Sequence, residues 1–209
     1  MVRQADYNHD DTWTLRKETN DPVWGRYSGI LYRRIMSLIE THGNAAHSVL
    51  DIGCGAGKFG CDVLAANYHY TGVDESAVAI QLGKAHWPNR DLHHRDFAVG
   101  RADDGMAAAF GVVVSLNVLH CLSEPEHRHT LLANAKRCSV EGGLLVLTTM
   151  VGPLQRPHRA GRNPRVYFTP DFIIEELRQS GWNHILHYDL QEASDLNPVA
   201  NLEVVCRNA

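Results

Sequence analysis

The sequence predicts a doubly wound α/β fold, in which helices cover both faces of a seven-stranded, mostly parallel sheet. Three observations support this prediction. Short runs rich in valine, isoleucine and leucine alternate with helical stretches along most of the chain, as they do where crossover helices join parallel strands. A glycine-rich turn directly follows the first of these runs. No helical stretch separates the last two runs, so we expect them to pair antiparallel, with the last strand running against the others.

The predicted strands and the first helix divide the chain into two parts. We expect strands at residues 48–52, 69–73, 92–94, 112–116, 144–149, 183–187 and 202–206. Residues 1–44 are expected to form an amino-terminal arm and a lid or cap helix, and residues 45–209 the main domain. Apolar residues recur every three or four positions from Trp24 to Leu38, which predicts an amphipathic helix that ends near Gly43.

Two later helices carry recognisable end signals. Ser123 and Glu126 form an S-x-x-E pattern soon after the fourth strand, which predicts a capping box at the start of a helix. Thr169 is followed by a proline, which suits the first turn of a helix, and Gly181 marks the expected end of that helix. Helices are therefore expected between the fourth and fifth strands and between the fifth and sixth.

The composition excludes several classes of protein. Of the 209 residues, 44% are hydrophobic and 21% charged, as in ordinary globular proteins, and no apolar run approaches the roughly 18 residues that cross a membrane. The first residues are polar and acidic, unlike a secretory signal, so we expect a cytoplasmic location. The net charge of −4 has the wrong sign for binding nucleic acid over the whole surface, which makes nucleic acid an unlikely partner.

Neither the cysteines nor the histidines predict a metal site. The five cysteines contain no C-x-x-C pair, and an odd number without such spacing does not indicate a disulfide framework. The 13 histidines are not spaced so that neighbours share one face of a helix or strand with a further ligand. We therefore expect reduced thiols and no metal, and the sequence leaves the oligomeric state open.

The most specific local signal is the segment LDIGCGAG, which spans residues 50–57. A buried strand runs into glycines at every second position and then into a predicted helix, so the chain can turn tightly and a ligand can lie against bare backbone. Gly55, Gly57 and Gly60 also satisfy the dinucleotide pattern G-x-G-x-x-G. A nicotinamide cofactor is therefore one alternative at this stage.

Acidic residues near the strand ends separate the alternatives. Asp74 follows Gly55 by nineteen residues, where a carboxylate can accept hydrogen bonds from both hydroxyls of a ribose. Asp51 precedes the glycines and suits a ligand with a cationic amino group. Asp96 and Phe97 follow the third strand and suit an adenine, because its amino group donates a hydrogen bond and its ring needs an apolar wall. A nicotinamide cofactor requires neither feature in that arrangement.

With these features the chain resembles the class I S-adenosylmethionine-dependent methyltransferases that act on small molecules. The resemblance runs from about residue 49 to residue 181. LDIGCGAG resembles the first motif of the family, TGVDES the second, RDF the adenine-binding acid, VVVSLNVLHCL the fourth and EGGLLVLTT the fifth. It implies a Rossmann-like fold, with S-adenosylmethionine as cofactor and S-adenosylhomocysteine as product.

The resemblance also implies the residues that bind the cofactor. They are Asp51 and Gly53 at the methionine part, Gly55 and Gly57 along the cofactor, Asp74 at the ribose, Asp96 and Phe97 at the adenine, and Leu116 and Asn117 at the methionine amine. One residue departs from the pattern: Gly111 stands where relatives often carry an acid before the fourth strand. This departure concerns packing more than chemistry.

Candidates for the acceptor side lie in two places. His120 follows the fourth strand at the expected mouth of the site, and its imidazole titrates near neutrality, so it is the candidate catalytic base or substrate contact. The alternative is a hydrogen bond to the scaffold. Trp24 and Tyr27 are expected to fold over the site as a lid and to contact the substrate, although ordinary helix packing would also explain them.

An arginine-rich stretch follows the fifth strand. Residues 151–165 carry four arginines and no acid, and the connection after this strand is expected to border the acceptor pocket. Arg156, His158 and Arg159 are therefore candidate substrate-binding residues that could hold a carboxylate or phosphate. The alternative is a solvated, mobile loop.

Taken together, these features predict a methyltransferase that transfers a methyl group from S-adenosylmethionine to an O, N or S atom of a small molecule, with an anionic acceptor favoured. The sequence lacks the (D/N)-P-P-(Y/F) motif of enzymes that methylate exocyclic amines and the Pro-Cys nucleophile of 5-methylcytosine chemistry. The alternatives are a methyltransferase that acts on RNA or protein, a nicotinamide-dependent oxidoreductase, and a cofactor-binding module without turnover.

Overall fold

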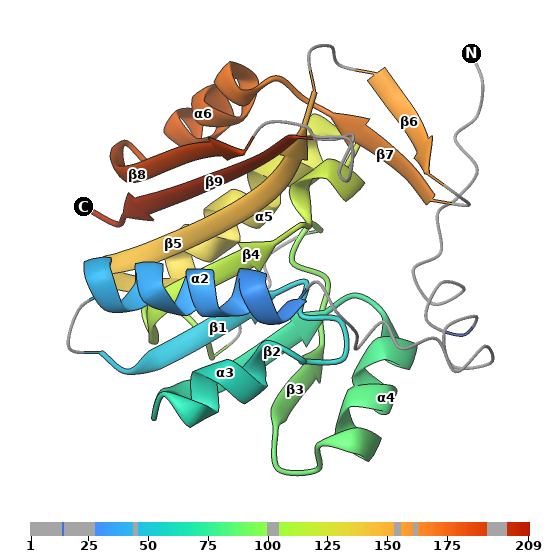
Figure 1. Cartoon of the computed structure of the whole chain (residues 1–209), viewed down its shortest axis with the longest axis vertical. Helices are drawn as coiled ribbons and strands as arrows, with labels where there is room; N and C mark the ends of the chain where they lie inside the picture. Colours follow the sequence, from blue (N-terminus) through green and yellow to red (C-terminus); the bar gives the residue numbers. More distant parts are fainter. Residues whose placement is uncertain are drawn as a thin grey trace.

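A seven-stranded sheet dominates the computed structural model of the chain (Figure 1). The structure describes residues 14, 28–43, 46–99, 105–152, 156–160, 163–191 and 200–209, and of residues 28, 156–160, 163 and 164 it describes the backbone alone. The strands of the large sheet are β1 Ser48–Ile52, β2 His69–Asp74, β3 Asp91–His94, β4 Phe110–Leu116, β5 Ser139–Val151, β8 His184–Gln191 and β9 Ala200–Arg207. A second sheet contains β6 Arg156–Ala160 and β7 Asn163–Tyr167.

The order of the strands in the large sheet is β3-β2-β1-β4-β5-β9-β8. The pairs from β3 to β5 are parallel, whereas β9 is antiparallel to both of its neighbours. This arrangement confirms the predicted doubly wound α/β fold, including the antiparallel last strand. Since the strand order reverses at β1, the carboxyl ends of β1 and β4 diverge there, and such a switch point is where open α/β sheets bind ligands.

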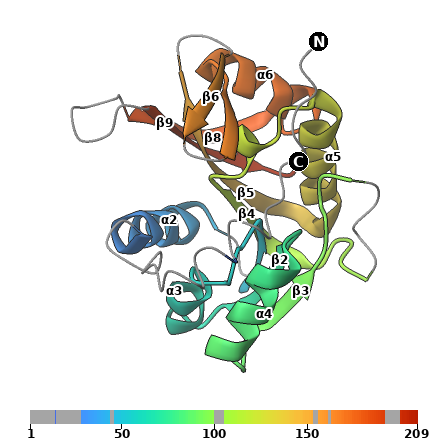
Figure 2. The same ribbon diagram turned by 90° about the vertical axis from the view of Figure 1, so that its right-hand side faces the viewer.

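The helices lie on both faces of this sheet. They are α2 Ser28–His42, α3 Gly60–Ala65, α4 Ala77–His86, α5 Pro125–Cys138 and α6 Pro170–Gln179, with a short 3-10 helix η1 at Leu119–Cys121. Alternate residues of β1 and β4 enter two separate cores: Val49 joins the core under α2, α3 and α4, and Leu50 joins the core under α5 and α6. Figure 2 shows α2 and α5 on opposite sides of the sheet.

The α2 helix belongs to this layered core. Ile35, Met36 and Ile39, spaced by one and three residues, are buried against the sheet. The guanidinium of Arg34 anchors the same helix to the last strand, because its Nε donates to both carboxylate oxygens of the buried Glu203, at 2.9 and 3.0 Å. No helix within the described ranges is both long and apolar enough to cross a membrane.

One of the two predicted helix starts is confirmed and the other is wrong. Thr169 caps α6 as expected, since its Oγ1 accepts a hydrogen bond from the backbone N–H of Phe172. The capping box at Ser123 and Glu126 was wrong. Glu124 is the N-cap of α5 and makes no side-chain capping bond. The helix begins one residue later than predicted, because Pro125 takes its first position.

The structure also extends the predicted strands. Strand β5 begins at Ser139, directly after α5, so Gly142 and Gly143 lie inside a strand and not at a helix end. The arginine-rich stretch that the sequence treats as a loop contains the antiparallel pair β6 and β7, whose register sets Arg156 opposite Tyr167 and His158 opposite Arg165. This two-stranded ribbon extends past the carboxyl end of β5 (Figure 1).

Candidate cofactor and acceptor site

The glycine turn after β1 lies at the switch point of the sheet. Gly53, Gly55 and Gly57 have φ angles of +77°, +56° and +76°, a region that side chains disfavour. The N–H groups of Gly53 and Cys54 both donate to the carbonyl oxygen of Val73, at 2.8 and 3.0 Å. The predicted helix does not follow the strand directly, since residues 53–59 separate the end of β1 from the start of α3 at Gly60. The turn therefore presents backbone beside the end of β2.

Asp74 ends β2 and faces this turn. One carboxylate oxygen accepts the N–H of Gly55 at 2.7 Å, and the other accepts the N–H of Ser76 at 2.9 Å. These two bonds fix the orientation of a buried carboxylate. Because each carboxylate oxygen can accept more than one hydrogen bond, the fixed acid can also receive ribose hydroxyls.

Asp51 lies on β1 just before the turn and is 3% exposed. The pKa of its carboxyl group is raised to about 7, mainly by burial. The hydrogen bond from the Tyr70 hydroxyl, at 2.8 Å, lowers the pKa, and the charge of Asp74 adds to the increase. A cation brought to this carboxylate would relieve the unfavourable charge. The ammonium group of a methionine moiety has the matching charge.

Asp96 and Phe97 follow β3 as the sequence predicts. Asp96 is exposed, and its Oδ1 accepts the N–H of Ala98 at 2.8 Å. Phe97 is buried in the core, and its carbonyl oxygen accepts a 2.8 Å bond from the amide of Asn134 on α5. The backbone at this position is therefore rigidly held, while the Asp96 side chain lies on the outside of the bend.

Leu116 and Asn117 lie at the carboxyl end of β4. Asn117 adopts a φ of +61°, and its N–H donates to the carbonyl oxygen of Thr148 on β5 at 2.8 Å. Its side-chain Oδ1 is buried and has no hydrogen-bond partner within the described part of the chain. An unpaired buried acceptor is costly, so it indicates a place where a ligand donor binds. The residues at this end of the sheet therefore fit a ligand with an ammonium group.

His120, in η1, is 1% exposed. Its Nδ1 lies 3.3 Å from the backbone nitrogen of Met150, which donates to it, and 3.3 Å from the Thr149 hydroxyl. Burial, followed by the positive charge of Arg165, lowers the pKa of the imidazole to about 3. The ring is therefore neutral at physiological pH, with Nδ1 as an acceptor and its proton on Nε2.

The structure leaves several predicted acceptor residues without a test. Trp24 and Tyr27 lie outside the described residues. Arg156, His158 and Arg159 lie on β6, but their side chains also fall outside the description. Sequence reasoning did not select Tyr70 as the partner of Asp51, because only the pairing of β1 with β2 brings them together.

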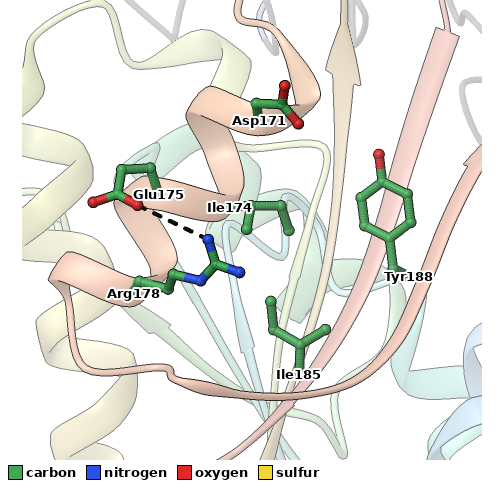
Figure 3. A pocket seen from close by; sticks show the side chains of 6 residues that line it. All are labelled: Asp171, Ile174, Glu175, Arg178, Ile185 and Tyr188. Carbon is green, nitrogen blue, oxygen red and sulfur yellow. Dashed lines mark ion pairs between the residues drawn. The ribbon is translucent and has the colours of Figure 1, made fainter.

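A groove of about 510 Å³ lies elsewhere, between α6 and β8 (Figure 3). Its apolar floor is formed by Ile174, Ile185 and the body of Tyr188, and Glu175 pairs with Arg178 at its rim. Since β8 is an edge strand and β1 is four strands away, this groove is separate from the glycine turn. Among the described side chains, no group of three or more histidine, cysteine or acidic residues could hold a metal ion.

Comparison with known proteins relates the chain to methyltransferases. Residues 50–145, which include the glycine turn, Asp74 and Asn117, match the family model described as "Methyltransferase domain". A solved S-adenosylmethionine-dependent methyltransferase from Methanosarcina mazei superimposes with a TM-score of 0.68 over 81% of this chain and 96% of its own, at 14% identity. The chain is therefore similar to S-adenosylmethionine-dependent methyltransferases, in sequence over residues 50–145 and in fold over most of its length. S-adenosylmethionine is the cofactor of this family.

Two further proteins that resemble the chain define the limits of the comparison. The ubiquinone biosynthesis O-methyltransferase of Maricaulis maris is 33% identical over 106 residues, which cover 49% of this chain and 40% of that protein. The match thus spans less than half the length of that relative. A TehB-like S-adenosylmethionine-dependent methyltransferase from Corynebacterium glutamicum shares the fold at 22% identity, with a TM-score of 0.65 over 95% of this chain and 97% of its own.

Proposed function

We propose that the chain transfers the methyl group of S-adenosylmethionine to a hydroxyl oxygen of a small molecule. The observation that carries the proposal is the contact between Gly55 and Asp74, which joins a bare glycine turn to an oriented carboxylate at the switch point of the sheet. The choice of oxygen over nitrogen or sulfur rests on the name of the relative from Maricaulis maris. The acidic net charge supports a small acceptor over a nucleic acid.

In this proposal the cofactor lies across the carboxyl ends of β1, β2 and β4. Asp74 receives the ribose hydroxyls, and Asp96 with the Phe97 backbone receives the adenine. Asp51 and the unpaired Oδ1 of Asn117 receive the ammonium of the methionine part. Gly53, Gly55, Gly57 and Leu116 supply the backbone along which the cofactor lies.

Bound S-adenosylmethionine supplies a methyl group already activated by a positively charged sulfur. The protein therefore has to align the acceptor oxygen with the methyl carbon and to exclude water. The neutral ring of His120 suits this task as a hydrogen-bond donor from Nε2, because its Nδ1 already accepts the N–H of Met150. We assign His120 to contact with the acceptor and not to proton removal. As the bond from the acceptor oxygen to the methyl carbon forms, the bond from that carbon to sulfur breaks to leave S-adenosylhomocysteine, and the hydroxyl proton passes to the solvent.

The remaining predicted residues complete the acceptor side of this proposal. Trp24 and Tyr27 cover the site as part of a lid within residues 1–44, and residues 45–209 form the catalytic domain. Arg156 and His158, which pair in register with Tyr167 and Arg165, line the acceptor pocket from the ribbon of β6 and β7, whereas Arg159 alternates to the other face of β6. A cytoplasmic location also stays a prediction.

The experiment is a screen for the product. Metabolite extract is incubated with the protein and S-adenosylmethionine that carries an isotopically labelled methyl group, and products are found by their label and a mass gain of one CH2 unit. We expect labelled O-methyl products with the wild-type protein and almost none with Asp74→Ala. Label in N- or S-methyl products alone would contradict the choice of oxygen, and no label in any small molecule would contradict the proposed function.

A further inference from the structure

Arg165 on β7 is a half-buried cation without an acidic partner in the described residues. Its Nη1 lies 3.3 Å from the sulfur of Met150, and a thioether is only a weak acceptor. Its Nε is buried and has no hydrogen-bond partner in the part of the chain that the structure describes. Removing a guanidinium from water without an anion is unfavourable, so this arrangement favours a ligand that brings one.

The position of Arg165 relates it to the catalytic side of the sheet. Strand β7 packs against η1, which carries His120 and Cys121. The ring of His120 lies 6.3 Å from that of Tyr167, two residues after Arg165 on the same strand. Since alternate residues of a strand point to the same face, Arg165 and Tyr167 both face η1. The guanidinium is therefore on the side of the ribbon where the acceptor is proposed to bind.

The charges around Cys121 connect this arginine to the cofactor end of the site. Burial raises the pKa of the Cys121 thiol, the charge of Arg165 lowers it, and the charges of Glu75 and Asp74 raise it. The thiol is therefore affected both by the charge of Arg165 and by the charge of Asp74, the residue proposed to bind the ribose.

No acid within the described residues forms an ion pair with Arg165. Asp74 accepts two backbone N–H groups, and none of the ion pairs within the described residues includes Arg165. A planar guanidinium with several N–H donors matches a carboxylate or a phosphate through two parallel hydrogen bonds. A neutral acceptor would leave these donors unpaired.

We infer that Arg165 binds an anionic group, a carboxylate or phosphate, on the methyl acceptor and thereby selects anionic small molecules. This inference rests on the proposed function, since it assigns the acceptor of that reaction. The anion on Arg165 holds one end of the acceptor at the ribbon, and His120 contacts it nearer the strand ends. Arg165 is a specificity-determining residue that touches the substrate away from the reacting oxygen.

The test measures anion preference by binding. Protein loaded with S-adenosylhomocysteine is titrated by calorimetry with benzoate, phenyl phosphate and the neutral benzamide. We expect the wild-type protein to bind benzoate or phenyl phosphate at least about tenfold more tightly than benzamide, and Arg165→Met to lose this preference. Arg178→Met, which changes an exposed arginine on α6, should keep it. Absence of the preference in the wild type, or its persistence in Arg165→Met, would overturn the inference.

A second arm asks whether the arginine serves the cofactor instead. S-adenosylhomocysteine carries a carboxylate, whereas 5′-methylthioadenosine lacks the whole amino acid part. We expect Arg165→Met to bind both compounds as the wild type does. Weakened binding of S-adenosylhomocysteine alone would assign Arg165 to the cofactor and overturn the inference. If the wild type binds no S-adenosylhomocysteine, the proposed function fails, and the anion titration on the ligand-free protein still decides the role of Arg165.

Discussion

The carboxylate of Asp74 accepts a 2.7 Å hydrogen bond from the backbone N–H of Gly55. Gly55 follows β1 and Asp74 is the last residue of the parallel strand β2, so their contact closes the glycine turn against the end of β2. The N–H groups of Gly53 and Cys54 bind the same strand end through the carbonyl of Val73. The proposed cofactor site therefore depends on the pairing of two strands and not on the glycine segment alone.

Binding of the cofactor should release a proton from Asp51. The pKa of this carboxyl is raised to about 7 in the folded protein, and a bound ammonium should lower it. Near pH 7, S-adenosylhomocysteine should therefore displace a fraction of a proton, and its affinity should fall as the pH drops below about 7. Calorimetry in buffers of different ionisation enthalpy measures this release.

The control for this prediction is 5′-methylthioadenosine, which has no ammonium group and should release no proton from Asp51. Asp51→Asn should abolish the release with S-adenosylhomocysteine. It should also remove a charge that disfavours folding, since the raised pKa makes the ionised carboxyl destabilising above about pH 7 and harmless below its ordinary value near 4. Equal proton release in Asp51→Asn and wild type would refute the assignment.

Gly53→Ala should destabilise the protein more than Gly142→Ala does. Both glycines have nearly the same φ, +77° and +73°, so both substitutions introduce a similar backbone strain, about 1 to 2 kcal/mol. A Cβ on Gly53 would also lie 2.3 Å from Cγ2 of Val118, whereas one on Gly142 would meet nothing within 4 Å. Urea unfolding of the two variants gives the comparison, and Gly53→Ala should also weaken cofactor binding. Equal losses of stability in the two variants would contradict this prediction, because they would show that the Val118 side chain moves away from the added Cβ at little cost.

His120 should make the protein sensitive to acid. Its pKa is lowered from 6.5 to about 3 on folding. Between these two pH values the imidazole is protonated in the unfolded chain and neutral in the folded chain. The free energy of unfolding should fall with decreasing pH in this window, by up to about 1.4 kcal/mol per pH unit from this group. His120→Ala should show a shallower slope than the wild type.

His120→Ala should also lose about 1 to 3 kcal/mol of stability at pH 7.5, because the part-buried N–H of Met150 loses its acceptor. Urea unfolding at several pH values measures both effects. A variant as stable as the wild type, with the same pH slope, would show that these hydrogen bonds contribute little.

Arg128 and Glu176 should be strongly coupled. Arg128 of α5 donates from Nε to both carboxylate oxygens of Glu176 on α6, at 2.8 and 2.9 Å, and both side chains are buried. Removal of one partner leaves an uncompensated charge, so Arg128→Met and Glu176→Leu should each cost about 3 to 5 kcal/mol. The double variant should lose much less than the sum of the two. Additive losses in urea unfolding would contradict this coupling.

Most of the fold was predictable because its signals are local. Each predicted strand of the large sheet is present, since runs of branched apolar residues suffice to mark buried parallel strands. Strands β6 and β7 were missed because their arginines and prolines show no alternation of apolar and polar residues. The early start of β5 was missed because of Gly142 and Gly143, since a pair of glycines is more typical of a helix end than of the interior of a strand.

The candidate site was predictable only in part. The spacing of Asp51, Asp74 and the glycines follows from the sequence, because strand ends and turns are local features. The partners that set their chemistry do not: Tyr70 reaches Asp51 through strand register. The deep burial of His120, which makes its ring neutral, depends on how β5 and β7 pack around η1. Titration behaviour of this kind has no signature in the sequence.

The most direct test of the account is calorimetric titration of the wild-type protein and Asp74→Ala with S-adenosylhomocysteine and NAD. We predict that the wild type binds S-adenosylhomocysteine and not NAD, and that Asp74→Ala binds it more weakly by roughly 1 to 3 kcal/mol, because the ribose hydroxyls lose their acceptor. Asp171→Ala, an exposed acid on α6, should bind like the wild type. Binding of NAD without binding of S-adenosylhomocysteine, or an unchanged affinity in Asp74→Ala, would contradict the account.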